Sequence, residues 1–136
     1  MPFELKFVLI LFGLAALSAP VSVYFIERQD IEQARTQAEA MTRGHAGAGK
    51  TAMLNYNCGA CHQIPGVSGA EGRVGPSLKS IAVRTEIAGR LVNTPENLAL
   101  WLRDPQRVVP GNGMPDQGVT EQQARDMAAY LYTLRR

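Results

Sequence analysis

A chain of 136 residues with a formal net charge of only +2 has room for one small domain and an extension, and it lacks the basic excess expected of a nucleic-acid-binding protein. Apolar residues make up 46% of the chain, but the N-terminal third differs in character from the rest. Past Gly44 too few residues remain for a large self-sufficient core, and a domain of that size usually needs a staple.

Residues 7–26 form an uncharged, largely apolar run. As a helix this run is about 30 Å long, the thickness of a bilayer core. A cleaved signal peptide is the alternative, but its apolar region is shorter, about 7–15 residues. Pro20 directly follows the small residues Ser18 and Ala19 and would hinder cleavage there. We therefore expect residues 1–27 to be a single, uncleaved transmembrane anchor.

Residues 28–43 are rich in Gln, Ala, Glu and Arg, with almost no apolar stripe. Good helix formers without an apolar face predict a solvated helix or a flexible tether. A stalk helix that continues the anchor and packs on a partner subunit remains open. The segment is interpreted as a helical or flexible connector.

Residues 44–51 match the G-x-x-x-x-G-K-S/T string of phosphate-binding loops. That string indicates a nucleotide site only when a buried strand precedes it and a helix follows it. Here the preceding residues are polar and helix-prone, and the chain has no hydrophobic parallel strands. We interpret the segment as the start of a domain's first helix and expect no nucleotide.

Cys58 and Cys61 are the only two cysteines, and His62 follows them directly. This is the C-x-x-C-H pattern of c-type haem attachment. Thiols three positions apart in a tight turn can each add to a vinyl group of one haem. The imidazole of the next residue then lies under the ring, where it can bind the iron. The pattern predicts one covalently attached haem c, which would also staple the small domain.

Three other interpretations of this motif are weaker. A structural disulfide would use the same two thiols. A thioredoxin-like redox pair should lie near a βαβ pattern, and none is visible. A four-ligand zinc site needs two more Cys or His ligands, and only His45 is left.

A second helix is indicated after a turn-rich loop over residues 63–73. Thr94 has the chemistry of an N-cap, Pro95 suits the first turn, and the helix should end near Asp104 because Pro105 cannot continue it. Trp101, the only tryptophan, either donates its N–H to a haem propionate or only packs in the core. Other core or haem-pocket positions are expected at Leu78, Ile81, Ile87, Leu91 and Val92.

Met114 lies in the middle of an irregular loop over residues 106–119 that is rich in Gly and Pro. A methionine there is poorly explained by core packing and well explained as a thioether ligand on the iron face opposite His62. His/Met ligation occurs in cytochromes c and raises the reduction potential. The weaker candidates for this ligand are Met41, His45, Met53 and Met127. A closing helix begins with the capping-box pattern Thr120 to Gln123.

These motifs together resemble the class I monohaem cytochrome c family. The resemblance covers residues 44–136 and rests on the C-x-x-C-H motif, Gly75-Pro76-Ser77-Leu78, Gly111-Asn112-Gly113-Met114-Pro115 and Ala129-Tyr130-Leu131. Residues 93–98 and 101–105 are similar to the haem c domain fused to subunit II of some bacterial cytochrome c oxidases. The resemblance implies an all-α class I cytochrome c fold wrapped around one haem, here preceded by the transmembrane helix.

The resemblance also implies roles for particular residues. The carbonyl of Pro76 should accept a hydrogen bond from the free ring nitrogen of His62. Gly49 should allow close approach of the first and last helices, and Tyr130 should contact the first helix. Families of this type receive haem outside the cytoplasm, so the haem domain is expected on the periplasmic side of a bacterial inner membrane.

The expected chemistry is electron transport. An iron with six ligands leaves no position for a substrate, so the chain by itself should be an electron carrier and not an enzyme. We expect a membrane-anchored cytochrome that donates to a terminal respiratory oxidase or forms its haem subunit. The alternative is a haem c electron-accepting subunit of a periplasmic dehydrogenase complex. A pentacoordinate gas sensor or peroxidase would require that Met114 not bind the iron.

Overall fold

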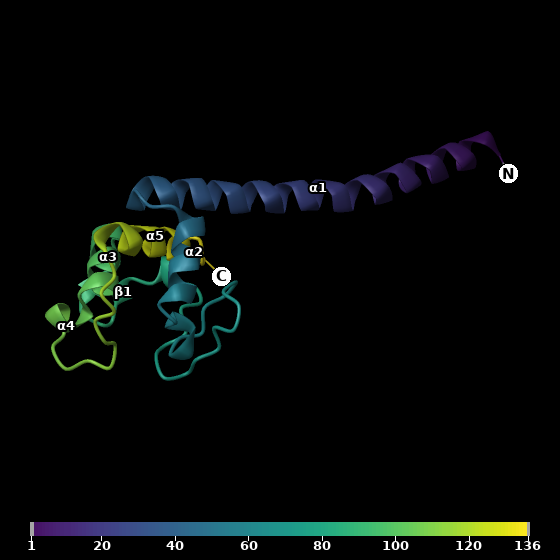
Figure 1. Cartoon of the computed structure of the whole chain (residues 1–136). Helices are drawn as coiled ribbons and strands as arrows, with labels where there is room; N and C mark the ends of the chain where they lie inside the picture. Colours follow the sequence, from purple (N-terminus) through teal and green to yellow (C-terminus); the bar gives the residue numbers. More distant parts are fainter. Residues whose placement is uncertain (1, 136) are drawn as a thin grey trace. The chain divides into compact units, whose positions relative to one another are not determined.

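The computed structural model describes residues 2–135 and divides into two compact units, Met1–Gln33 and Ala34–Arg136. Helix α1 (Phe3–Thr42) forms the first unit, and its last turns belong to the second (Figure 1). By length and composition α1 is able to cross a membrane. Met1 and Arg136, the outermost residues of the expected anchor and haem domain, lie outside the described residues.

The second unit is helical, as expected, with one short antiparallel pair of strands that the sequence did not indicate. Its elements after α1 are α2 (Ala46–Asn55), η1 (Cys58–Ala60), η2 (Ile81–Val83), β1 (Glu86–Ile87), β2 (Leu91–Val92), α3 (Pro95–Arg103), α4 (Pro105–Val108) and α5 (Glu121–Tyr132). Helices α2 and α3 both pack against α5 (Figure 1). The strands pair Ile87 with Leu91.

The predicted helix ends are confirmed. The Thr94 hydroxyl accepts a hydrogen bond from the Asn97 amide at 3.2 Å, and α3 ends at Arg103. Thr120 and Gln123 form the capping box of α5. The expectation of an irregular loop from Gln106 is wrong at its start, because Pro105 opens the short helix α4. Proline suits the first turn of a helix, where its missing N–H has no partner to lose.

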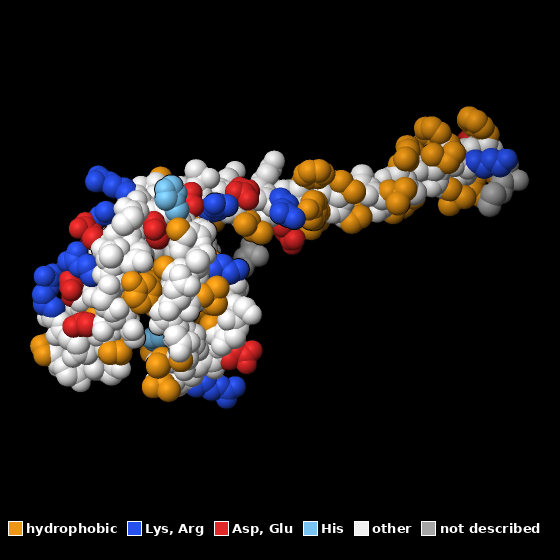
Figure 2. All heavy atoms as spheres, viewed as in Figure 1, with side chains coloured by type: hydrophobic (Ala, Val, Ile, Leu, Met, Phe, Trp, Pro, Cys, Tyr) orange, Lys and Arg blue, Asp and Glu red, His pale blue; other side chains and the backbone are white. Residues whose placement is uncertain are grey.

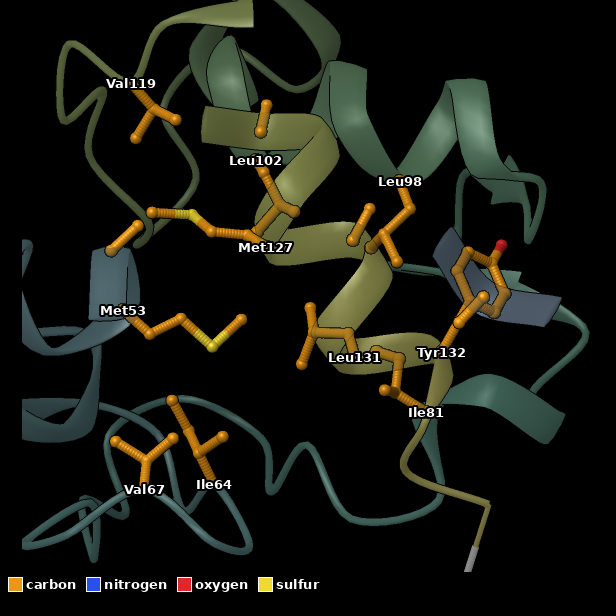
Figure 3. Packing of buried hydrophobic residues seen from close by; sticks show 14 of the residues in the cluster. Met53, Ile64, Val67, Ile81, Leu98, Leu102, Val119, Met127, Leu131 and Tyr132 are labelled. Carbon is orange, nitrogen blue, oxygen red and sulfur yellow. The ribbon is translucent and has the colours of Figure 1, made fainter. Parts of the chain in front are cut away.

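The hydrophobic core is built mainly from α2, α3, α5 and the loop after the cysteines (Figure 3), with further side chains from Ala38 of α1, Ile81, Ile87 and Val119. Its largest fully buried side chains include Met53 of α2, Leu98 of α3, and Met127 and Leu131 of α5. Ile64 joins them from the loop. Val92 does not lie in the core: its side chain is 66% exposed, because successive residues of a strand face opposite sides.

Two glycines let α2 lie directly against the backbone of α5. A Cβ atom built on Gly49 would lie 1.9 Å from the carbonyl oxygen of Asp126, and one on Gly44 would lie 2.3 Å from that of Arg125. The predicted role of Gly49 in close helix packing is confirmed. Gly44 and Gly49 of the phosphate-loop string therefore have a structural role here, whereas a Cβ atom on Gly47 would meet nothing within 4 Å.

The N-terminus of α2 is held by carboxylates from two other helices. Glu39 of α1 accepts a hydrogen bond from the Ala46 amide at 2.9 Å, and Asp126 of α5 accepts one from the His45 amide at 2.8 Å. Both donors belong to the unpaired N–H groups of a helix start. The compact unit thus begins at Ala34, upstream of the boundary expected at residue 44. The end of α1 contacts the rest of the compact unit through small residues such as the buried Ala38. This explains why the sequence of residues 28–43 shows no apolar stripe.

Replacement of Glu39 by Gln should remove a pH-dependent part of the stability. The hydrogen bond from the Ala46 amide, and then Arg35, hold the pKa of Glu39 below its ordinary value. A carboxylate with a lowered pKa stabilises the fold above the unfolded-state pKa, about 4.3, and loses this effect as the pH falls through the folded-state pKa. Thermal unfolding should therefore separate wild type from Glu39→Gln at neutral pH and bring them together in acid. A difference that grows in acid would contradict this assignment.

Candidate functional site

Cys58, Cys61 and His62 lie in one tight turn that begins in η1. The His62 amide donates to the Cys58 carbonyl at 3.0 Å, which closes the turn. Cys58 is half-buried against the hydrophobic core, and Cys61 is exposed. A Cβ atom on Gly59 would lie 2.7 Å from the Cα atom of Ala70, so the turn rests directly on the following loop. The two thiols are thus presented from a fixed backbone.

The ring of His62 is oriented by the segment that contains Pro76. Its Nδ1 lies 2.8 Å from the Pro76 carbonyl oxygen. A carbonyl can only accept, so Nδ1 carries the proton and Nε2 keeps its lone pair for a metal. The Gly75 amide donates to the Cys61 carbonyl at 2.8 Å, which ties the two segments together. The structure thus has the contact between His62 and Pro76 that the resemblance implied.

Gly75 makes room for the imidazole. A Cβ atom there would lie 2.3 Å from Cε1 of His62, far inside any permitted contact. Gly75→Ala should therefore turn the ring away from the Pro76 carbonyl and disturb the orientation that a metal bond through Nε2 would need. We expect a less stable haem-bound form and a changed reduction potential, measured by thermal unfolding and redox titration. Gly69→Ala is not a matched control because Gly69 has a positive φ. Gly47→Ala on α2 adds a Cβ atom in open space outside this turn and should leave the reduction potential unchanged.

Met114 is half-buried and packs against the same core cluster as Cys58. Its main chain is held by two side-chain amides: its N–H donates to Oδ1 of Asn112 at 2.7 Å, and its carbonyl accepts from Nε2 of Gln106 at 2.7 Å. Neither amide was singled out from the sequence. Pro105 before Gln106 was a usable signal for a helix start, and Asn112 between two glycines was one for a side-chain-stabilised turn.

The remaining candidates lie elsewhere. Trp101 is half-buried on α3 against the core cluster, and its side chain makes no hydrogen bond to another of the described residues. Its place is compatible with core packing and with a propionate contact. His45 is the exposed N-cap of α2, far along the chain from the Met114 loop. Met53 and Met127 are fully buried core residues, and Met41 is exposed on α1.

The residues fit a haem c group. Figure 2 shows a hollow between the part of the second unit that carries α3 and α4 and the part that carries α2, with a histidine inside it and hydrophobic side chains at its rim. The donor set is two thiols three positions apart and an imidazole whose Nε2 is free to bind. Burial raises the pKa of the Cys58 thiol. Haem supplies one-electron exchange between Fe(III) and Fe(II).

A small helical domain with a C-x-x-C-H turn, a histidine bonded to a proline carbonyl and a methionine in a braced loop defines a c-type haem protein. The family model described as "Cytochrome c" matches residues 46–135, and the chain belongs to this family. It is therefore an electron-transfer protein with a covalently bound haem c. The expected class I cytochrome c fold is confirmed.

Curated relatives are of two kinds. Cytochrome c oxidase subunit 2 of Alkalihalophilus pseudofirmus is 33% identical over 106 residues, covering 77% of this chain and 30% of the relative. The same subunit of Bacillus sp. (strain PS3) is 38% identical over 88 residues, 62% of this chain and 25% of the relative. Cytochrome c2 of Agrobacterium tumefaciens is 34% identical over 90 residues, 54% of this chain and 79% of the relative. The chain thus spans less than a third of these oxidase subunits. No solved structure matches it.

Proposed function

We propose that the chain carries single electrons through one haem c, bound by thioethers to Cys58 and Cys61 and ligated by His62 and Met114. The observation that carries this proposal is the hydrogen bond from Nδ1 of His62 to the Pro76 carbonyl. It fixes the ring and its tautomer before the metal binds, and it raises the donor strength of Nε2. Trp101 contributes a wall of the pocket and an N–H for a propionate.

The role of the protein groups is to hold the iron in one geometry in both oxidation states. His62 of the C-x-x-C-H turn would supply one iron ligand, and the loop that carries Met114 would hold the thioether as the second. A thioether ligand would favour Fe(II) and raise the potential. With both of these ligands bound, the iron would have no position left for a substrate, and the group would supply one-electron exchange alone.

We further propose that α1 is a single-pass anchor in a bacterial inner membrane, with the haem domain on the periplasmic side. The apolar length of α1 supports the anchor. Similarity to relatives named cytochrome c oxidase subunit 2 supports a terminal respiratory oxidase as the electron acceptor or as the complex that contains this chain. The domain division would then be residues 1–27 as anchor, 28–43 as helical or flexible connector and 44–136 as cytochrome domain, with the connector from Ala34 onward packed on that domain.

The test begins with the protein extracted from membranes in mild detergent. A haem c pyridine haemochrome and the weak red charge-transfer band of Met-ligated ferric haem are expected, with co-purification of oxidase subunits. Protease added to the periplasmic side should cleave the haem domain from α1. A haem c spectrum without that band and with carbon monoxide binding on reduction would contradict Met114 ligation. Co-purification with a dehydrogenase would contradict the oxidase role and leave the site intact.

A further inference from the structure

The loop that carries Met114 is organised by two side-chain amides. Gln106, on α4, makes three hydrogen bonds through its side chain: Nε2 donates to the carbonyls of Asn112 at 2.9 Å and Met114 at 2.7 Å, and Oε1 accepts from the Gly111 amide at 3.0 Å. Asn112 also makes three. Its Nδ2 donates to the carbonyls of Pro105 at 2.9 Å and Val109 at 2.7 Å, and its Oδ1 accepts from the Met114 amide.

As a consequence, the N–H and the carbonyl of Met114 both form hydrogen bonds with side chains and not with the backbone of a strand or helix. When a residue of an irregular loop binds a metal, the loop loses conformational entropy, and this loss weakens the binding. Here the two side-chain amides supply the hydrogen bonds that a helix or sheet would otherwise provide. Asn112 also donates to the carbonyls of Pro105, the first residue of α4, and of Val109, which directly follows α4. The backbone of Met114 is therefore fixed without help from the thioether.

We propose that Gln106 and Asn112 are positioning residues that form an amide latch, holding Met114 ready for the iron and opposing its replacement by other ligands. The proposal rests on the proposed ligation by Met114. With the latch intact, breaking the Fe–S bond frees only the side-chain torsions of Met114. Without it, the same rupture also releases the loop, so the gain in entropy favours the open form. The latch thus sets how readily an exogenous ligand displaces Met114.

The donor pattern suggests diagnostic variants. Gln106→Ala removes all three bonds of that side chain. Gln106→Glu keeps an acceptor for the Gly111 amide, but it loses the donor to the Met114 carbonyl and places a carboxylate oxygen against that carbonyl, so it should weaken the hold on Met114 at least as much as Gln106→Ala. Asn112→Asp keeps the acceptor for the Met114 amide and loses the donors to Pro105 and Val109, so it should be milder than Asn112→Ala.

The experiment is imidazole titration of the oxidised, full-length holoprotein, followed by loss of the red charge-transfer band. Imidazole must displace Met114 to bind, so its apparent affinity reports the open population. We expect about tenfold tighter imidazole binding in Gln106→Ala and Asn112→Ala, the size of effect that one or two net hydrogen bonds give. The Asp variant of Asn112 should recover part of the difference.

Asn93 offers a matched control outside the loop. Its amide also makes three hydrogen bonds, donating to the carbonyls of Ile81 and Arg84 and accepting from the Tyr132 hydroxyl. Asn93→Ala should lower the unfolding temperature about as much as Gln106→Ala and leave imidazole affinity at the wild-type value. Equal affinity in all variants, with the band present in wild type, would overturn the latch alone. A wild-type protein without the band would overturn ligation by Met114 and the latch with it.

Discussion

Replacement of Met114 by Leu should convert the carrier into a protein with an open iron position. Leucine is close to methionine in size but has no thioether, so the loop keeps its packing while the iron loses a ligand. We expect the charge-transfer band to disappear and carbon monoxide to bind the reduced form. The reduction potential should fall by about 0.2 V or more, within the roughly 0.8 V range that axial ligands cover. Redox titration and carbon monoxide difference spectra measure these changes.

Met127→Leu is the matched control for that substitution. Met127 lies on α5 in the hydrophobic core and is 1% exposed. A volume-conserving exchange at this position should lower the free energy of unfolding by less than about 1.5 kcal/mol. Its band, potential and lack of carbon monoxide binding should stay those of wild type. If Met127→Leu or Met53→Leu abolished the band while Met114→Leu kept it, the ligand assignment from the sequence would be wrong.

Residues whose role depends on local chemistry could be predicted from the sequence. The C-x-x-C-H spacing predicted the tight turn found at Cys58 to His62, and Thr94, Pro95 and the capping box predicted the N-terminal ends of α3 and α5 correctly. Local rules suffice there because a cap or an attachment motif is made by residues that are neighbours in the chain. The contact of His62 with Pro76 followed from the family resemblance and not from spacing.

Residues whose role depends on tertiary contacts could not. Glu39 looked like one charge among several in a polar connector, yet it binds the start of α2 across a chain reversal. Gln106 looked like the first residue of a loop, and only the folded positions of Asn112 and Met114 reveal its three bonds. Val92 was expected in the core or the haem pocket because valine is apolar, and its side chain is absent from the core of the described residues. The type of a residue indicates whether its side chain favours burial or hydrogen bonding. Which partner it meets depends on segments that only the folded chain brings together.

Replacement of Gly49 by Ala should have the largest effect on stability of any single methyl addition in α2. The new Cβ would lie 1.9 Å from the carbonyl oxygen of Asp126 and 2.3 Å from its carbonyl carbon. These are backbone atoms inside α5, so no side chain can rotate away and the two helices must separate. Overpacking costs about 1–3 kcal/mol and occasionally more, and a backbone clash belongs at the upper end. A loss of about 3 kcal/mol lowers the unfolding temperature of a domain of this size by roughly 10–20 °C.

Gly47→Ala is the control in the same helix, and the opposite sign is expected. A Cβ atom on Gly47 meets nothing within 4 Å, and alanine restricts the unfolded chain, so this variant should gain about 0.4–1 kcal/mol. Thermal unfolding of both holoproteins, followed by haem absorbance, compares them directly. Stabilisation by both substitutions would show that α2 and α5 are not in backbone contact. Helix propensity favours alanine at both positions, and only the contact with α5 distinguishes them. Changes of opposite sign in the unfolding temperature would therefore show that the stability of the fold depends on the close distance between α2 and α5.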